Sequence, residues 1–314
     1  MPPELFRLYH DLDLETLRIR RPSKFIFFCG GAMQDAPHAA CSLRHYLLRD
    51  RRIAPRLKAD VVLAEEANQL YRESDYGDLI SFEEDISKIA ALILLIAESA
   101  GSLAELGAFA AVPSIRKRLA VLIQSEHEEA ESFVRYGPLE RLKSEDDRRL
   151  AAIPWILNKK SALIKQTAAP HVSDIVGFIN EQLKRIPAEE SWKSAEELQT
   201  FVLILWLLHL SHAMTITQLL SYTQAIRPAM TQKDLRNALF CMKLAGWVTK
   251  FRHLNCDYWC STAMADPFSR YSFKEGVERD PIRRKADVAD AIAKELKLSR
   301  QVRERVQEKK GAIP

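Results

Sequence analysis

The sequence lacks the long apolar runs, cysteine pairs and signal segments that mark several common protein classes. No run of about 18 apolar residues occurs, and the most apolar segment, FVLILWLLHL at 201–210, is too short to span a bilayer. The start, MPPELFRLYHDLDLETLRIRR, has no apolar core of a signal peptide. Five cysteines without a disulfide-like framework fit a reducing compartment. We therefore expect a cytoplasmic protein that does not contact a membrane.

Common phosphate-binding and zinc-binding motifs are also missing. The sequence contains no Walker-type lysine loop, and Gly30-Gly31 is only a fragment of the G-x-G-x-x-G dinucleotide motif. A tight turn and a phosphate or sugar contact both remain open for these two glycines. A zinc site could use Cys241, His253, Cys256 and Cys260, but these residues lack the C-x2-C pair of most zinc sites, which favours buried thiols. We expect no metal and no cofactor.

The sequence does contain enough apolar residues for a large core. Its 314 residues are 47% hydrophobic and 28% charged, a composition that favours two domains. The net charge of +4 is unevenly distributed, because residues 271–314 contain twelve Lys or Arg and eight Asp or Glu. This segment indicates a basic helical tail, which either contacts an acidic partner or forms a solvated surface helix.

The first 150 residues alternate between strand and helix patterns. Four apolar runs predict strands, at 24–29, 59–64, 91–96 and 119–124. Helical patterns lie between them, including SFEEDISKIA at 81–90 and the segment that carries Glu105. This alternation predicts an α/β fold with a doubly wound, mostly parallel sheet of the flavodoxin or Rossmann type. The pattern does not fix the order of the strands.

Helix signals dominate the later part of the chain. Residues 194–212 predict a long apolar helix. Thr215 and Gln218 have the spacing of a capping box at the start of the next helix. Thr231 and Asp234 predict the start of a third, with an acidic residue in its first turn.

Residues 247–262 then alternate aromatic and β-branched residues around an Asn-Cys-Asp turn, which predicts a hairpin. Three helices followed by a hairpin indicate a winged helix-turn-helix. The expected division is a catalytic domain, a helical linker, a winged-helix-like domain and the basic tail, at residues 1–150, 151–193, 194–270 and 271–314.

The helix after the central strand carries a carboxylate, Glu105. Ser102 and Glu105 have the S-x-x-E spacing of a capping box, which would give Glu105 a structural role. Alternatively, Glu105 stabilises or captures the oxocarbenium-like cation formed when an N-glycosidic bond is cleaved. A helix N-terminus would keep this carboxylate ionised near neutral pH. The small residues around it leave room for a ribose at the strand's carboxyl end, where open α/β sheets bind ligands.

Three blocks in the first 150 residues resemble the effector proteins encoded beside retron reverse transcriptases. The blocks are FFCGG (27–31), AESAGSLAELGAF (97–109) and SFVRYGPLERLK (132–143). The resemblance implies an N-terminal domain like nucleoside 2-deoxyribosyltransferases and a C-terminal winged-helix-like domain. Carried over by position, it implies that Glu105 is the catalytic glutamate. It also implies that two loops bind the substrate, one with Cys29, Gly30 and Gly31, and one with Glu98, Ser99, Gly101 and Ser102.

The sequence departs from the deoxyribosyltransferase pattern at Ala91, where those enzymes usually place a base-contacting aspartate. Other groups must then bind the base and protonate it as it leaves, with Asp85, Glu84 and Glu98 as candidates. A leaving group that is already cationic, such as the nicotinamide of NAD, needs no acid. The departure therefore favours NAD-like substrates, and hydrolysis over transfer to a second base.

The resemblance implies an antiphage toxin with N-glycosidase activity on NAD, nucleosides or nucleotides. It also implies restraint by a reverse transcriptase and its multicopy single-stranded DNA. Like-folded enzymes often complete their sites across subunits, so we expect a homo-oligomer or a higher-order complex. The alternatives are a DNA-binding regulator that senses a nucleotide without cleaving it, and a structural subunit. The substrate, the trigger and the oligomer stay open.

The expected winged-helix region offers basic residues for a nucleic acid or a protein partner. Its third helix and its hairpin supply Lys233, Arg236, Asn237, Lys243, Lys250 and Arg252. The hairpin aromatics Tyr258 and Trp259 could stack on bases or pack in the core. Residues 196–270 contain seven basic and five acidic side chains, a small excess for an autonomous DNA-binding domain. A protein-scaffold role therefore stays as open as direct DNA contact.

Overall fold

The computed structural model describes the chain in four segments, residues 2–33, 40–66, 74–159 and 162–310. Contacts within the chain define two compact units. The sheet unit comprises residues 24–69 and 77–186, and the second unit comprises residues 1–23, 70–76 and 187–314. The chain therefore passes between the units four times. The four domains expected from the sequence remain a prediction.

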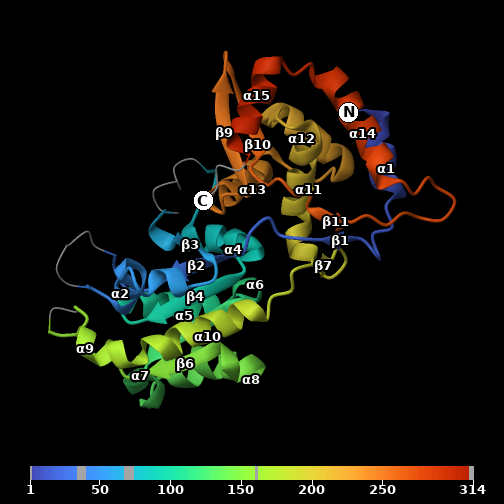
Figure 1. Ribbon diagram of the computed structural model, residues 1–314. Helices are drawn as coiled ribbons and strands as arrows, with labels where there is room; N and C mark the ends of the chain where they lie inside the picture. The colour runs from blue at the N-terminus through green and yellow to red at the C-terminus, as the bar shows by residue number, and fades with distance from the viewer. Residues whose placement is uncertain (1, 34–39, 67–73, 160–161, 311–314) are drawn as a thin grey trace. The chain divides into compact units, whose positions relative to one another are not determined.

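The sheet unit is built on five parallel strands in the spatial order β3-β2-β4-β5-β6 (Figure 1). They are β2 (Phe25–Cys29), β3 (Asp60–Leu63), β4 (Leu92–Ala97), β5 (Leu119–Gln124) and β6 (Leu150–Ile153). Counted along the chain this order is 2-1-3-4-5, which is that of flavodoxin-like sheets. The order reverses between β2 and β4, and such sheets bind ligands at the carboxyl ends of those two strands. The predicted α/β class with a parallel sheet is confirmed.

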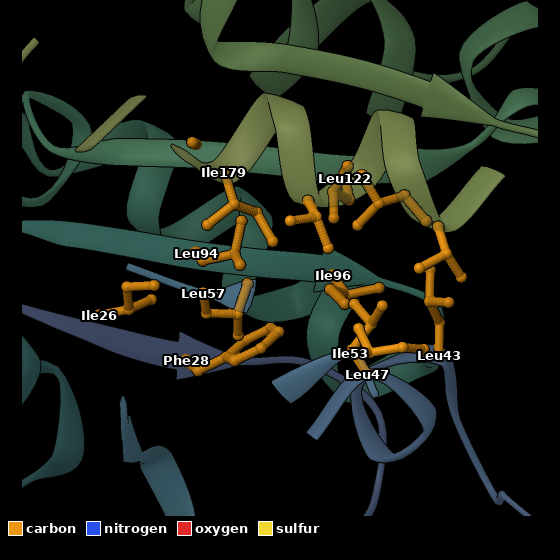
Figure 2. Close-up of a cluster of buried hydrophobic side chains, with 14 of the residues drawn as sticks. Ile26, Phe28, Leu43, Leu47, Ile53, Leu57, Leu94, Ile96, Leu122 and Ile179 are labelled. Carbon is orange, nitrogen blue, oxygen red and sulfur yellow. The ribbon is translucent and has the colours of Figure 1, made fainter. Parts of the chain in front are cut away.

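One face of the sheet is covered by helices that are far apart in the sequence. Ile26 and Phe28 of β2 belong to one buried cluster with side chains of α2 (Leu43–Arg49) and α10 (Val172–Lys184) (Figure 2). Helix α10 lies within the range 151–193 expected to be a helical linker, and strand β6 overlaps the start of that range. Both elements are part of the sheet unit.

The opposite face of β2 meets another group of helices. The ring of Phe27 lies 6.1 Å from the ring of Phe82, which belongs to α4 (Leu79–Ile89). Helix α6 (Pro113–Arg116) contacts both α4 and α5 (Ala100–Ala111). Because alternate residues of a strand point to opposite faces, β2 is buried on both sides, and it therefore appears in the sequence as a continuous apolar run.

Shorter helices complete the sheet unit. They are η1 (Ala54–Arg56), α7 (Ser125–Glu129), η3 (Arg135–Leu139), α8 (Glu140–Asp146), η4 (Asp147–Arg149), α9 (Lys165–Ala168) and η5 (Ala169–His171). The segment η3 is one π-helical turn.

The second unit contains two small antiparallel sheets. One has the order β11-β1-β7, from β11 (Phe268–Arg270), β1 (Arg18–Ile19) and β7 (Glu190–Ser191). The other has the order β8-β10-β9, from β8 (Met214–Thr215), β10 (Cys256–Ser261) and β9 (Val248–His253). The helices of this unit are α1 (Pro3–Asp11), α11 (Glu196–Ser211), α12 (Ile216–Ile226), α13 (Gln232–Leu244), α14 (Pro281–Leu296) and α15 (Arg300–Lys309).

Helices α12 and α13 begin where the sequence predicts. The Thr215 side chain accepts a hydrogen bond from the Gln218 amide, and the Thr231 side chain accepts one from the Asp234 amide. The side chains of Gln218 and Asp234 in turn accept hydrogen bonds from the backbone amides of Thr215 and Thr231. Both helices therefore begin with a capping box.

The most apolar segment of the chain is a core helix. Most of the 16 residues of α11 are buried, on all sides of the helix. No helix among the described residues is long and apolar enough to cross a membrane.

The hairpin predicted at 247–262 is present, but its turn differs from the expected one. Cys256 already pairs with His253, so Leu254 and Asn255 form the turn. Leu254 has φ +52°, the left-handed conformation that tight hairpin turns require. The predicted Asn-Cys-Asp turn is therefore wrong by about one residue, because Cys256 and Asp257 belong to β10.

Candidate active site

The candidate site lies at the carboxyl ends of β2 and β4, where the strand order reverses. Gly30 follows β2 with φ +148°, a conformation that L-residues with a side chain rarely adopt. A Cβ atom here would lie 3.0 Å from the Ile96 carbonyl oxygen and 3.1 Å from the Ile96 Cβ. Glycine therefore lets the β2 loop pass close to β4, which accounts for at least the first glycine of FFCGG.

Glu98, directly after β4, holds this loop in place through hydrogen bonds. Its carboxylate accepts hydrogen bonds from the backbone amides of Leu43 (2.6 Å), Arg44 (3.2 Å) and Gly31 (3.3 Å). Burial raises the pKa of Glu98, and these amide donors oppose the rise. A Cβ atom on Gly31 would lie 2.8 Å from Glu98 Oε1, so this glycine is needed for close approach. Glu98 thus ties the first loop to the N-terminus of α2.

This anchor predicts a large structural cost for Glu98→Ala. The change leaves three amides, including two at the start of α2, without their acceptor. We expect the free energy of unfolding to fall by about 3 kcal/mol, as for loss of buried charged hydrogen bonds. Denaturant unfolding measures this fall, and Glu129→Ala on the exposed surface of α7 is the control. Equal stability of the two variants would contradict the anchoring role.

The start of α5 is capped by residues other than those expected. The Ser99 side chain accepts a hydrogen bond from the Ser102 amide (3.2 Å), and Ser102 Oγ accepts one from the Ser99 amide (2.9 Å). Ser99 and Ser102 therefore form the capping box, and the neighbouring Gly101 is exposed. The capping-box interpretation of Ser102 and Glu105 is wrong, because Glu105 lies in the second turn of the helix.

Glu105 is half-buried, and its carboxylate is not used by the helix. The Oε2 atom is buried and has no hydrogen-bond partner among the described residues. Burial raises the pKa of Glu105 to about 7; Glu65 adds to the rise, whereas the Arg44 guanidinium opposes it. A pKa of about 7 leaves about half of this group protonated at neutral pH, which differs from the expectation that a helix N-terminus keeps it ionised. A carboxylate with a raised pKa and no partner for one oxygen, at the edge where such sheets bind ligands, is a candidate for a functional residue.

Arg44 supplies a positive charge that acts on Glu105. Its side chain is fully buried, and its guanidinium donates to the carbonyl oxygens of Gly31 and Phe28, both at 2.9 Å. It also forms an ion pair with Glu65. Because these partners fix the guanidinium, Arg44 provides a stationary charge that partly offsets the surrounding carboxylates.

Glu83 of α4 is a second carboxylate in this group, and the sequence reasoning missed it. Burial, followed by repulsion from Glu105, raises the pKa of Glu83 to about 8. The two acidic residues that follow Glu83 in the sequence have other partners. Glu84 accepts a hydrogen bond from Ser114 (3.1 Å), and Asp85 is paired with Lys88 (2.6 Å). Three adjacent acidic residues look alike in the sequence, and only the packing of α4 shows which one is buried near Glu105.

The raised pKa of Glu83 has a consequence for stability. Its folded-state pKa of about 8 lies above the ordinary value of 4.5, so folding favours the protonated form. That contribution is complete below about pH 4.5 and is lost as the pH rises through about 8. We expect Glu83→Gln to raise the free energy of unfolding at pH 8.5 by on the order of 2 kcal/mol. At pH 4.5 we expect little change. Thermal unfolding at both pH values tests this, with Glu84→Gln as the control.

Cys29 is the last residue of β2, next to the Gly30-Gly31 loop. Its thiol is fully buried, and burial, then Glu105, raises its pKa well above the ordinary range. A protonated, fully buried thiol is no nucleophile at neutral pH. Cys241 and Cys260 in the second unit are buried as well, as predicted, whereas Cys256 is exposed. Within the described residues, no three His, Cys, Asp or Glu side chains gather as metal ligands.

The basic residues proposed as partner contacts differ in exposure. Lys233 and Arg252 are exposed, and Lys243 is half-buried. Arg236 lies 3.5 Å from the Asp75 carboxylate. Asn237 is only 6% exposed, and its side chain accepts a hydrogen bond from the Asp75 amide. The structure therefore gives Asn237 a packing role and leaves little of it for a partner to contact.

A comparison with protein families now places this chain. The model of the STM3845 retron effector protein family matches residues 40–250, about two thirds of the chain. The chain belongs to this retron effector family. The matched range includes the carboxylates at the strand ends and the α12–α13 region of the second unit.

Two relatives of this retron effector come from Escherichia coli. One, the "Retron Ec73 putative ribosyltransferase/DNA-binding protein", is 28% identical over 127 residues, which cover 40% of each chain. The other, the "Retron Ec86 putative ribosyltransferase/DNA-binding protein", is 31% identical over 119 residues, 38% of this chain and 37% of the relative. The matches thus span about two fifths of each relative.

Proposed function

We propose that this retron effector is an antiphage toxin that cleaves N-glycosidic bonds, with Glu105 as the catalytic residue. One observation carries the proposal: the buried, unpartnered Oε2 of Glu105 beside the carboxyl ends of β2 and β4. The word ribosyltransferase in the relatives' names supports chemistry at a ribose C1 atom.

In the proposed reaction, the ionised carboxylate of Glu105 faces C1 of the ribose. The bond between C1 and the base nitrogen breaks, and its electron pair goes to the base. Glu105 captures the cation as an ester or stabilises it. Water then forms a bond to C1, the ester bond to Glu105 breaks where it has formed and returns its electron pair to the carboxylate, and the water loses a proton to the solvent. Glu98, through Gly31 and α2, is a positioning residue for the loop beside this reaction.

Glu83 would supply the proton that the departing base needs. With a pKa of about 8 it is largely protonated at pH 7, whereas Glu105, with a pKa of about 7, is about half ionised. Two carboxyl groups held in different protonation states are the arrangement of acid and nucleophile in glycoside cleavage. Asp85, Glu84 and Glu98 are less suited, because each is engaged by other partners.

We further propose that α11 to β10 form a winged-helix domain that contacts the reverse transcriptase and its multicopy single-stranded DNA. The element order helix, strand, helix, helix, hairpin supports this, as do the words DNA-binding protein in the relatives' names. These partners would restrain the toxin until infection. A homo-oligomer or higher-order complex with them is part of the proposal.

Release of free base tests the activity. The full chain, purified without its partners, is incubated separately with NAD, a nucleoside and a nucleotide, and the mixtures are separated by chromatography. We expect nicotinamide or a nucleobase to appear at a rate proportional to protein concentration. The DNA-binding regulator that only senses a nucleotide predicts no release from any of the three, and that result would overturn the proposal.

A further inference from the structure

A groove in the second unit combines positive charge with an aromatic side chain. It has a volume of about 360 Å³ and lies between α13 and the β9–β10 hairpin. Its lining includes Arg236, Phe240, Lys243, Lys250, Asp257 and Trp259. Three cations and one carboxylate thus face the same space. The candidate active site belongs to the other unit, so this groove is a separate feature.

Trp259 gives the groove a flat apolar surface. It is half-buried, whereas the other four tryptophans of the chain are at most 3% exposed. Trp259 lies opposite Lys250 in the hairpin register, and the Lys250 ammonium is 5.9 Å from the centre of its ring. The same ammonium is 3.8 Å from the Asp257 carboxylate. A partly open indole with a cation beside it can hold a base by stacking and the adjoining phosphate by charge.

The residues around the groove fit a single strand of nucleic acid better than a duplex. A helix that reads the major groove must project polar side chains to the base edges. On α13, Asn237 is buried, and its side chain accepts a hydrogen bond from the Asp75 amide. The cations instead border a concave space next to Trp259. Stacking on an aromatic ring within a positive groove is how proteins hold single strands without reading a sequence.

We propose that this groove binds single-stranded nucleic acid, with one base stacked on Trp259 and the neighbouring phosphates held by Arg236, Lys243 and Lys250. The inference rests on the nucleic-acid partner of the proposed function, and it specifies where and in which form that partner binds.

Tryptophan fluorescence of the full chain tests the groove, because Trp259 is the tryptophan that a base can reach. The probes are a 12-nucleotide oligothymidylate, a 12-nucleotide oligouridylate and a 12-base-pair DNA duplex, each labelled for anisotropy. We expect the single strands to quench fluorescence and to bind at least about tenfold more tightly than the duplex. Three phosphate contacts predict a slope of log affinity against log salt of about −2. The tighter of the two single strands identifies DNA or RNA as the ligand.

Variants locate the contact. Trp259→Leu should abolish the quenching and weaken binding about tenfold, and Trp259→Phe should abolish quenching but retain affinity within about threefold. Lys250→Gln should weaken binding about fivefold and reduce the magnitude of the salt slope by about 0.7. Lys193→Gln, an exposed lysine of the same unit outside the groove lining, is the control.

Three results would overturn the inference: duplex bound as tightly as both single strands, binding without quenching, or equal losses in Lys193→Gln and Lys250→Gln. None of them concerns base release. If base release persists while the groove fails these tests, the glycosidase proposal stands and only this inference is lost.

Discussion

Glu105→Gln is expected to reduce base release by about 10³-fold or more and to leave the fold intact. The amide has nearly the same shape as the carboxyl group, but it carries no negative charge to capture or stabilise a sugar cation. Because Oε2 has no hydrogen-bond partner among the described residues, the change breaks no contact of that atom. Chromatography of released base measures the loss, and thermal unfolding reports the fold.

The same variant separates catalysis from stability. Burial raises the pKa of Glu105, so the neutral amide should keep or raise the unfolding temperature at pH 8. Glu84→Gln on α4 is the matched control, since it removes a nearby carboxylate that Ser114 engages, and it should retain near-normal base release. Full base release by Glu105→Gln would show that the catalytic assignment is wrong.

Glu83→Gln is expected to have an effect that depends on the leaving group. With a nucleoside, whose base leaves as an anion unless it is protonated, loss of the acid should lower kcat/KM by 10² to 10⁴-fold, the usual range for general acid catalysis, or about 3–5 kcal/mol. With NAD, the nicotinamide leaves as a neutral molecule, and we expect less than about a threefold change. For each substrate, kcat/KM is measured for the wild-type protein and for Glu83→Gln, and the fold-changes for the two substrates are compared.

The pH dependence of the rate gives a second test of Glu83 as the proton donor. For a nucleoside, the rate should rise as Glu105 ionises near pH 7 and fall as Glu83 loses its proton near pH 8. For NAD, the descending limb should be absent. Equal losses for the two substrates in Glu83→Gln would contradict a proton-donor role, because they would indicate that Glu83 only shapes the site.

The sequence predicted those parts of the fold whose signals are local. The strands overlapping 24–29, 91–96 and 119–124 are buried on both faces, so they form uninterrupted apolar runs. The starts of α12 and α13 were predictable because a capping box involves only four consecutive residues. Strand β6 was missed because its residues 150–153 are only partly buried and follow a run of charged side chains.

The candidate site was only partly predictable, because its contacts join residues far apart in the chain. Glu105 could be found from its place after a central strand. The position of Glu98 was predicted, but not its bonds to Leu43 and Arg44, which lie 55 and 54 residues away. Glu83 could not be distinguished from its acidic neighbours until the packing of α4 was known. The substrate-binding roles expected for Ser99 and Gly101 remain predictions.

The way the chain returns between its two units limits how they can be separated. Residues 1–23 supply the middle strand of the β11-β1-β7 sheet, and Asp75 and Tyr76 bond to α13. A C-terminal fragment made by a cut in the 151–193 region would therefore lack strand β1 and the two residues that bond to α13. We therefore expect such a fragment to be less stable than the same residues in the intact polypeptide, and point substitutions in the full chain are the better way to study each unit.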